Sequence, residues 1–373
     1  MILQLHHRYR HSGGEERAVA DLAWLIRTEL GEDAEVLERA SDEVGRGRAA
    51  LGLLAGGLGP GEVADAVRRS GARVVHAHNV HPTLGWRALA AAREAGARVV
   101  LHLHNYRLVC AVGTCFTDGA DCTRCHGRDT RPGVRHNCRG SRAEALTYAA
   151  GLSLWQRRLT GAADAIVVPS AFALDRLRAL GAPVDGALVL PSVQREIAER
   201  SRAAEGEYVL AAGRLTPEKG FADVVRAAKQ AGLPLVVAGD GPELAALRAE
   251  APDARFAGRV SPEQLAELRA HAAVAVVPSR YAEILPLAAL EAMAAGLPVV
   301  AARSGGLAEA VPPEGLYEPG NVQELAERLH TLYADAQAGE RSLQLARERY
   351  APSVIATTLR AIYDRNSHPA TVL

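Results

Sequence analysis

The sequence lacks several features that would assign it at once to a common class of protein. Its 43 basic and 43 acidic residues leave no net charge, which argues against a protein that coats nucleic acid. The longest apolar stretch without a charge, residues 49–61, is shorter than the roughly 20 residues that span a bilayer. No repeat of fixed period is present, and the chain begins on MILQL without a basic leader segment. We therefore expect a cytoplasmic protein without a signal peptide.

Lysine is nearly absent, because only Lys219 and Lys229 occur among the basic residues. Lys219 lies in the loop AAGRLTPEKGF (211–221), which follows an apolar strand and also carries Arg214. An arginine can grip phosphate oxygens in a bidentate manner, whereas a lysine acts as a point charge. In so arginine-rich a chain, a lysine in this loop indicates a role that arginine would serve poorly.

Two glutamates flank the start of an apolar helix in VVPSRYAEILPLAALEAMAAGLPVV (276–300). We predict a buried strand at 274–277 and a helix at 287–295 with Pro286 at its first position. Glu283 and Glu291 then differ by about 800° of helical rotation, so Glu283 belongs to the loop, facing a ligand. The alternative is a pair of solvated surface glutamates, but an unpaired Glu291 among apolar neighbours would be costly. One carboxylate could hold sugar hydroxyls and the other a ribose, with a diphosphate at the helix N-terminus between them.

Strands and helices alternate in two sets, which predicts two doubly wound α/β domains. The chain is also long for a single core. The expected strands lie near 2–6, 35–38, 73–77, 98–103 and 165–168, then 207–212, 234–238, 254–257, 273–277 and 298–301. The expected helices lie near 15–30, 61–70, 84–95, 142–160 and 171–180, then 219–231, 242–250, 262–270, 287–295, 321–336 and 340–364.

Taken in order, these motifs resemble the retaining glycosyltransferases of family 4. Arg214, Lys219 and the pair Glu283 and Glu291 look like the active-site signature of that family. The other matching segments are SGGEERAV (12–19), VVHAHN (74–79), HLHNYRLVC (102–110), DAIVVPSAF (164–172), VVAGDGPE (236–243) and FAGRVSPEQL (256–265). The resemblance implies the GT-B fold, in which two Rossmann-like domains face each other across a cleft. It places an acceptor-binding domain at 1–185 with a Cys-rich insertion at 108–142, a nucleotide-sugar domain at 186–345, and a final helical segment at 346–373 that crosses back to the first domain.

The resemblance also assigns roles to individual residues. Catalytic roles fall to His104, Arg214, Lys219 and Glu283. Contacts to the nucleotide sugar fall to Gly13, Gly14, Gly213, Arg214, Lys219, Gly239, Arg259, Val260, Glu283, Leu285, Pro286, Leu287 and Glu291. The acceptor side comprises Glu15, His78, Asn79 and Asn105. The donor is then a UDP-, GDP- or ADP-sugar, the acceptor is a glycan, a lipid-linked or a small molecule, and no nucleic acid takes part.

The resemblance implies glycosyl transfer with retention at the anomeric carbon. Positive charge from Arg214, Lys219 and the helix N-terminus would stabilise the leaving diphosphate, so no cofactor is required at the catalytic centre. A nucleotide-sugar epimerase of similar architecture and a non-catalytic protein that binds sugar nucleotides remain alternatives. A metal centre of three histidines is a third interpretation of the cluster His76, His78, His102 and His104, but neither an aspartate pair nor an HExxH pattern accompanies them.

All five cysteines fall within residues 110–138, and Cys122 and Cys125 form a Cys-x-x-Cys pair flanked by Cys110 and Cys138. Four thiolates around such a turn can bind a structural zinc ion. A redox pair and unligated thiols are the alternatives. Ten arginines against four acidic residues between 98 and 158 give this region an excess of six positive charges. That excess suits an anionic membrane surface, a diphosphate-bearing acceptor, a zinc-ribbon module that binds nucleic acid, or a solvated basic face.

Overall fold

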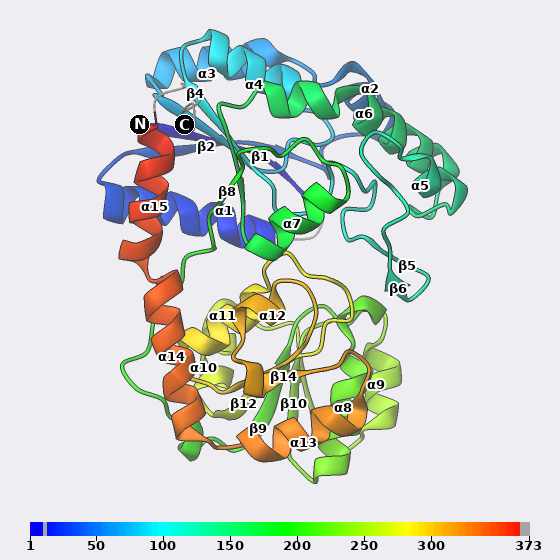
Figure 1. The fold of residues 1–373 in the computed structure, drawn as a ribbon, viewed down its shortest axis with the longest axis vertical. Helices are drawn as coiled ribbons and strands as arrows, with labels where there is room; N and C mark the ends of the chain where they lie inside the picture. The colour runs from blue at the N-terminus through cyan, green and yellow to red at the C-terminus, as the bar shows by residue number, and fades with distance from the viewer. Residues whose placement is uncertain (10–12, 366–373) are drawn as a thin grey trace. The chain divides into compact units, whose positions relative to one another are not determined.

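The computed structural model describes residues 1–9 and 13–365, and they form two compact units (Figure 1). The first unit comprises Met1–Cys115, Cys122–Val193 and the chain from Pro352 onward. The second comprises Phe116–Asp121 and Gln194–Ala351. The change from the first unit to the second thus falls at Val193, whereas the sequence places it at residue 185.

The first unit contains a six-stranded sheet in which every pair of neighbours is parallel, in the order β2-β1-β3-β4-β7-β8. Because helices cover both faces of a parallel sheet, its inner strands β1, β3 and β4 are buried along almost their whole length. The strands are β1 (Ile2–Arg8), β2 (Ala34–Ala40), β3 (Val74–Ala77), β4 (Arg98–His102), β7 (Ala165–Val168) and β8 (Leu188–Val189). The helices are α1 (Gly14–Leu25) with its π-helical extension Ile26–Leu30, α2 (Arg46–Ala55), α3 (Pro60–Ser70), α4 (Gly85–Glu94), α5 (Arg131–Arg135), α6 (Arg142–Gly161) and α7 (Ala171–Ala179).

The last helix, α15 (Pro352–Asp364), packs on the sheet of the first unit. Its Ile355 and Leu359 join the apolar cluster of Ile2 and Val74. The single helix expected at 340–364 is in fact two, because α14 (Ala336–Tyr350) ends before Pro352. Proline lacks the N–H that would continue the helical hydrogen bonds, so the chain turns there.

The second unit contains another parallel six-stranded sheet, in the order β11-β10-β9-β12-β13-β14. This is the strand order of a dinucleotide-binding doubly wound fold. The strands are β9 (Tyr208–Ala212), β10 (Leu235–Ala238), β11 (Arg255–Gly258), β12 (Ala272–Val277), β13 (Val299–Ala302) and β14 (Leu316–Tyr317). The helices are α8 (Phe221–Ala231), α9 (Leu244–Glu250), α10 (Pro262–Ala270), α11 (Leu287–Ala294), α12 (Leu307–Ala310), α13 (Val322–Leu332) and α14.

Each sheet has a point at which the strand order reverses, and ligands bind there in open α/β sheets. In the second unit the reversal lies between β9 and β12, and in the first between β1 and β3. The loops that leave these four strands carry most of the residues that the sequence selects as functional. One further element, the hairpin of β5 (Phe116–Thr117) and β6 (Ala120–Asp121), lies within the Cys-rich insertion.

Candidate active site

The loop after β9 is held in place by close backbone packing against the loop after β10. A Cβ at position 239 would lie 1.8 Å from the carbonyl oxygen of Gly213, so only glycine fits there. Gly213 donates its N–H to the carbonyl of Ala238 at 2.9 Å, and Leu215 donates to Asp240 at 2.9 Å. Gly213 and Gly239, both assigned to the donor by resemblance, thus fix the backbone from which Arg214 projects. The Arg214 side chain itself is exposed.

The structure brings Lys219 and Glu283 together from two neighbouring strands. Gly220 has a φ of 70°, and a Cβ there would lie 2.3 Å from the carbonyl oxygen of Pro278, so glycine lets the two loops touch. Lys219 Nζ donates to Glu283 Oε1 at 2.7 Å, and the Ser279 hydroxyl donates to the same oxygen. The side chains are 19% and 8% exposed. The pair therefore lies largely out of solvent at the strand-order reversal.

The charge on Lys219 is stabilised where it lies. Burial opposes the charged amine, but the carboxylate of Glu283 and the neighbouring Tyr281 outweigh it, so the pKa of Lys219 is raised. Lys219 Nζ lies 5.1 Å from the centre of the Tyr281 ring. Burial, reinforced by Glu283, raises the pKa of Tyr281 to about 12. At neutral pH the site thus holds a lysine cation and a protonated tyrosine.

A loop that the sequence analysis did not select clamps the backbone of Glu283. Gly306 donates its N–H to the Glu283 carbonyl at 2.7 Å, and the Ser304 hydroxyl donates to the carbonyl of Tyr281 at 2.9 Å. Gly305 has a φ of 58°, and a Cβ there would lie 2.4 Å from the Glu283 carbonyl oxygen. The Ser-Gly-Gly sequence directly after an apolar strand was the available signal for this clamp.

The helix after Glu283 differs in detail from the sequence expectation. Pro286 is the N-cap of α11 rather than its first residue, and Leu287 begins the helix. Glu291 is not unpaired, because it forms an ion pair with Arg269 of α10. Leu285 and Val260 are half-buried and pack against the apolar core, while Arg259 is exposed. Arg269 therefore already pairs with the Glu291 carboxylate, so the cost of leaving that carboxylate unpaired no longer argues that Glu291 binds a ligand.

In the first unit, Glu15 is the centre of a partly buried polar network. Its Oε2 accepts hydrogen bonds from the Tyr9 hydroxyl at 3.1 Å and from Asn105 Nδ2 at 3.4 Å. Arg107 Nη1 donates to the same hydroxyl at 2.8 Å, and its guanidinium lies over the Tyr9 ring. Burial raises the pKa of Glu15. The structure thus joins Glu15 and Asn105, which were both predicted on the acceptor side, through Tyr9 and Arg107, which were not selected.

The glycine motif at the start of α1 is organised by Glu16. Gly13 is the N-cap of the helix, and its N–H donates to Glu16 Oε2 at 2.7 Å. Tyr9 donates its N–H to Glu16 Oε1 at 3.1 Å. Burial opposes the charge, but His6 and these N–H groups prevail and lower the pKa of Glu16 to about 2. Gly14 is the first residue of the helix, while Ser12, which opens the motif, lies outside the described residues.

Asn79 and His78, both predicted on the acceptor side, are buried and hydrogen-bonded within this unit. Asn79 Nδ2 donates to the carbonyl of His7 at 2.6 Å, and its Oδ1 accepts the N–H of His81 at 3.2 Å. His78 Nδ1 lies 2.8 Å from His104 Nε2, and His78 Nε2 lies 2.8 Å from the amide of Gln4. Both side chains are buried. The polar atoms of the two predicted acceptor-side residues are therefore occupied within the protein.

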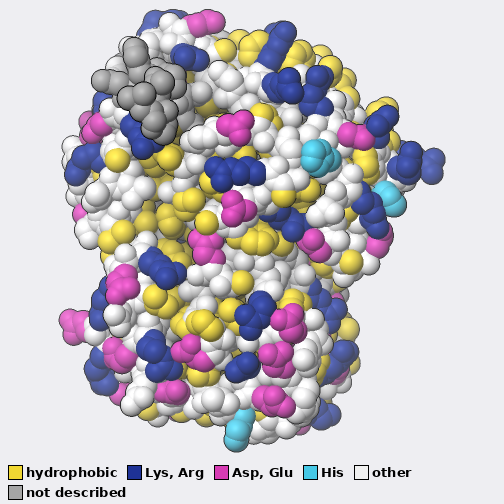
Figure 2. Space-filling model, in the orientation of Figure 1, with side chains coloured by type: hydrophobic (Ala, Val, Ile, Leu, Met, Phe, Trp, Pro, Cys, Tyr) yellow, Lys and Arg dark blue, Asp and Glu magenta, His cyan; other side chains and the backbone are white. Residues whose placement is uncertain are grey.

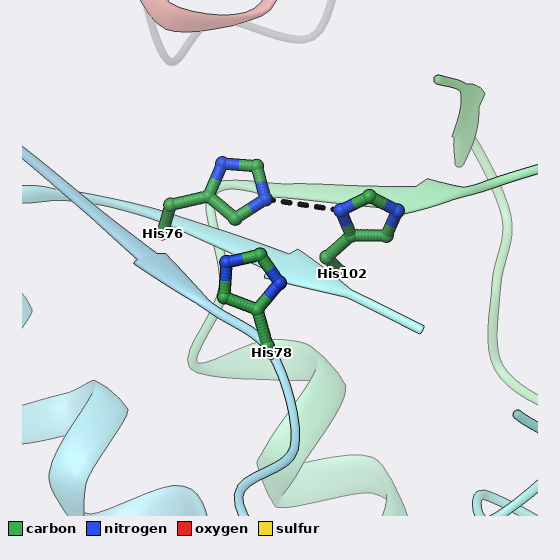
Figure 3. Close-up of side chains that lie close together, drawn as sticks. All are labelled: His76, His78 and His102. Atoms are coloured by element: carbon green, nitrogen blue, oxygen red, sulfur yellow. Dashed lines mark hydrogen bonds between the residues drawn. The ribbon is translucent and has the colours of Figure 1, made fainter. Parts of the chain in front are cut away.

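The histidines of β3 and β4 are packed together as hydrogen-bonded pairs. His76, His78 and His102 each offer a ring nitrogen, and the three lie within 4.8 Å of one another (Figure 3). However, His76 Nε2 is bonded to His102 Nδ1 at 3.2 Å, and the His76 and His78 rings are stacked with planes 22° apart. Lone pairs lie in the ring plane, so stacked rings do not direct them at one ion. Burial lowers the pKa of His76 to about 3 and those of His78 and His102 well below the ordinary value, which keeps these imidazoles neutral.

The four predicted zinc ligands all lie in the insertion, but their Sγ atoms do not group within 4.8 Å of one another as the ring nitrogens of His76, His78 and His102 do. Cys122 follows the β5–β6 hairpin, and its N–H donates to the carbonyl of Cys115 at 2.8 Å. Burial, with the charges of Cys110, Cys122 and Cys138, raises the pKa of Cys125 to about 11. Of the four non-glycine residues with positive φ in the described chain, three lie in this insertion: Cys115, Asp118 and Asn137.

Comparison with known proteins identifies the family. Residues 2–192 match the glycosyl transferase 4-like domain, and residues 193–349 match the glycosyl transferases group 1. The GDP-mannose-dependent alpha-mannosyltransferase of Mycobacterium tuberculosis is 33% identical over 186 residues, covering 47% of this chain and 48% of that protein. The sulfoquinovosyl transferase of Arabidopsis thaliana is 34% identical over 219 residues, covering 52% and 42%. The chain therefore matches less than half the length of these curated relatives.

Solved structures show the same fold along nearly the whole chain. Sucrose-phosphate synthase from Thermosynechococcus elongatus has a TM-score of 0.70 at 18% identity, covering 97% of this chain and 98% of that chain. Anabaena HepE, solved with UDP and glucose, has a TM-score of 0.64 at 19% identity, with the same coverage. The two family models together extend over both units, and this chain belongs to the glycosyltransferases of family 4, with the GT-B fold.

Proposed function

We propose that this protein transfers a sugar from a nucleotide diphosphate sugar to an acceptor hydroxyl with retention of anomeric configuration. The observation that carries the proposal is the Lys219–Glu283 pair at the strand-order reversal of the second unit. Lys219 and Ser279 both bond Glu283 Oε1, which leaves Oε2 without a bonding partner among the described residues. A donor-sugar hydroxyl could donate to that oxygen while Lys219 and Arg214 face the diphosphate.

The reaction breaks the bond between the anomeric carbon and a phosphate oxygen, and the electron pair leaves with the diphosphate. Fixed positive groups aimed at that developing charge are worth about 10²–10³ in rate each. Lys219, Arg214 and the N-terminus of α11 supply them, so the proposal requires no metal ion at the centre. The acceptor hydroxyl bonds the anomeric carbon from the leaving-group side and gives its proton to a phosphate oxygen. Glu291 would bind the ribose, at the expense of its ion pair with Arg269.

The first property to determine is which nucleotide diphosphate the protein binds. Relatives are named for GDP-mannose, and a structural neighbour was solved with UDP, so UDP-, GDP- and ADP-sugars are the candidates. Thermal unfolding with each diphosphate and its sugars tests binding, since a ligand at 100 times its Kd stabilises by about 2.7 kcal/mol. NMR of the product then reports the anomeric configuration. Release of a C2-inverted sugar without acceptor would favour an epimerase, and binding without turnover on any acceptor would favour a non-catalytic protein.

We also propose that Cys110, Cys122, Cys125 and Cys138 hold a structural zinc ion. Four thiol groups gathered in one loop repel once ionised, and a zinc ion removes that repulsion by binding them as thiolates. The loop contains backbone conformations that L residues rarely adopt, so it needs an external constraint to persist. Neither the fold nor the family match requires the metal, so the cysteines alone motivate this proposal.

A face of the first unit suits peripheral contact with an anionic membrane. Of the six exposed large hydrophobic residues in the described chain, four lie on α2 and α6: Leu51, Leu54, Leu146 and Leu154. These two helices pack against each other. Figure 2 shows hydrophobic and basic side chains side by side at the upper right, where Figure 1 labels α2. No helix among the described residues is both long and apolar enough to span a bilayer.

The charge of this face favours lipid over a protein partner. Arg48 on α2 and Arg157 and Arg158 on α6 are exposed beside the leucines, and the Arg158 guanidinium lies 5.2 Å from the ring centres of Trp86 and Trp155. Each basic residue near an anionic bilayer contributes about 1 kcal/mol. Leucines that enter the headgroup region add the burial of apolar surface. We therefore propose that α2 and α6 rest on anionic lipid while the acceptor is glycosylated.

A further inference from the structure

Two buried side chains and one half-buried side chain, from three neighbouring strands and the loops that follow them, form a continuous hydrogen-bonded chain in the first unit. Gln4 lies on β1, His78 follows β3, and His104 follows β4. His78 Nε2 lies 2.8 Å from the Gln4 amide, and His78 Nδ1 lies 2.8 Å from His104 Nε2. Gln4 and His78 are 0% and 3% exposed. The chain therefore connects the buried middle of the sheet with a histidine at its carboxyl edge.

The backbone of α1 fixes which way the Gln4 amide faces. The carbonyl of Val19 lies 3.3 Å from one end of the amide, and the N–H of Ala23 lies 3.2 Å from the other. A carbonyl can only accept and an N–H can only donate, so the NH₂ group of Gln4 faces Val19 and its oxygen faces Ala23. In this orientation the same NH₂ group donates to His78 Nε2 at 2.8 Å.

The direction of that bond determines the tautomer of both histidines. A neutral imidazole has one nitrogen that donates and one that accepts. Because His78 Nε2 accepts from Gln4, its proton lies on Nδ1, from which it donates to His104 Nε2. His104 Nε2 is then the acceptor, and its own proton lies on Nδ1. Burial lowers the pKa of both histidines well below the ordinary value, so neither gains a second proton at neutral pH.

We infer that Gln4 and His78 are positioning residues that hold His104 as a neutral imidazole protonated on Nδ1. His104 thereby presents a hydrogen-bond donor, and not a lone pair, to an oxygen of the donor sugar. This last step rests on the proposed function and on the catalytic role that the family resemblance gives to His104, whereas the tautomer itself rests on neither. His78, expected on the acceptor side from sequence, acts through His104.

The tautomer can be measured directly in the full-length protein with ¹⁵N-labelled histidine. Protonated and unprotonated ring nitrogens differ widely in chemical shift, and loss of one signal set in His104→Asn assigns the residue. We expect His104 to carry its proton on Nδ1 in the unmodified protein. A proton on Nε2 would overturn the inference, whether or not any variant folds.

The Gln4→Met variant tests the origin of the preference, because it fills the same space without a donor. We expect His104 to redistribute its proton toward Nε2, and we expect kcat to fall by about tenfold or more because the imidazole no longer holds a fixed donor for the transition state. Tyr363→Phe is the matched control. It removes a buried hydroxyl that bonds His76 Nδ1 at 2.8 Å and leaves the chain from Gln4 to His104 intact.

The outcomes separate the inference from the proposed function. Gln4→Met with an unchanged His104 tautomer would overturn the role of Gln4. An altered tautomer with wild-type kcat would uphold the positioning chain and refute the contact between His104 and the donor sugar. A comparable loss of kcat in Tyr363→Phe would show that the effect follows general loosening of the buried sheet, and would likewise overturn the inference.

Discussion

The Lys219–Glu283 pair allows a decisive test of whether this site serves catalysis or only stability. Lys219→Met keeps the length of the side chain and removes its charge. It leaves Glu283, only 6% exposed, with the Ser279 hydroxyl in place of a cation. Removing one partner of a buried pair costs about 3–5 kcal/mol, and we expect the lower end because the Lys219 side chain is 19% exposed.

The double variant Lys219→Met/Glu283→Gln separates the two roles. Without the carboxylate, no unpaired charge remains buried, so the free energy of unfolding should recover most of the loss. Turnover should not recover, because the positive charge that we propose faces the diphosphate is still missing. We expect turnover at saturating donor to stay at least about 10²-fold below that of the unmodified protein in the single and double variants alike.

Two measurements complete this test: urea unfolding followed by circular dichroism, and turnover with saturating donor. If the double variant regained turnover together with stability, Lys219 would act only by neutralising Glu283, and its catalytic role would be refuted.

The pH dependence of stability adds a check on the pairing. The folded pKa of Lys219 is raised, so the stability it contributes is fully present below the unfolded value of about 10.4 and is lost only as the pH rises through the folded value. The stability that the Lys219–Glu283 pair contributes should therefore be constant from about pH 6 to 9. A decrease of that contribution within this window would contradict the pairing.

Four further predictions follow from other parts of the structure. Glu291→Ala should weaken binding of the bare nucleotide diphosphate in calorimetry, whereas unchanged affinity would exclude the ribose contact. Purified protein should carry about one zinc per chain by elemental analysis, lost in Cys125→Ser but kept in Cys115→Ser; metal-free protein with an intact, protease-resistant insertion would refute the site. Leu51→Ser with Leu154→Ser should reduce sedimentation with phosphatidylglycerol vesicles about tenfold, while Val354→Ser on α15 should not, and equal effects would exclude this face. Glu16 has a pKa lowered to about 2, so its stabilisation should hold above about pH 4.3 and be lost as the pH falls toward 2; an identical acid transition in Glu16→Gln would contradict this.

The sequence predicted the elements that carry strong local signals and missed those that depend on packing. Helix α2 was not expected, because Gly45, Gly47 and Gly52 give its segment a low helix propensity. The structure shows why one of these is glycine: a Cβ at position 52 would lie 2.6 Å from the carbonyl oxygen of Pro82. Contact with neighbouring helices thus stabilises a helix that the local sequence does not favour. Strands β8 and β14, with two residues each, are too short to leave a periodic pattern.

For the candidate site, the sequence predicted the loop positions of individual residues but not the partners of their side chains. The motifs placed Lys219 and Glu283 correctly in loops after neighbouring strands, because apolar runs and glycines mark such loops. The partners of individual side chains could not be predicted in this way. The pairing of Glu291 with Arg269 joins two helices, and the bond from Gln4 to His78 joins β1 to the residue after the neighbouring β3; only the packing of the folded elements brings these residues together.

The two units hold functional side chains in different charge states at the carboxyl ends of their sheet strands. At the β9–β12 reversal, buried Lys219 stays charged because Glu283 is bonded to it, as recognition of a diphosphate requires. Beside the β1–β3 reversal, at the ends of β3 and β4, burial without a bonded carboxylate keeps His78 and His104 neutral. Sugar hydroxyls are uncharged and are distinguished by the direction of each hydrogen bond, which a neutral imidazole of fixed tautomer supplies and a mobile cation does not. We therefore expect substitutions near Lys219 to alter the response to phosphate charge, and substitutions near His78 to alter which sugar is accepted.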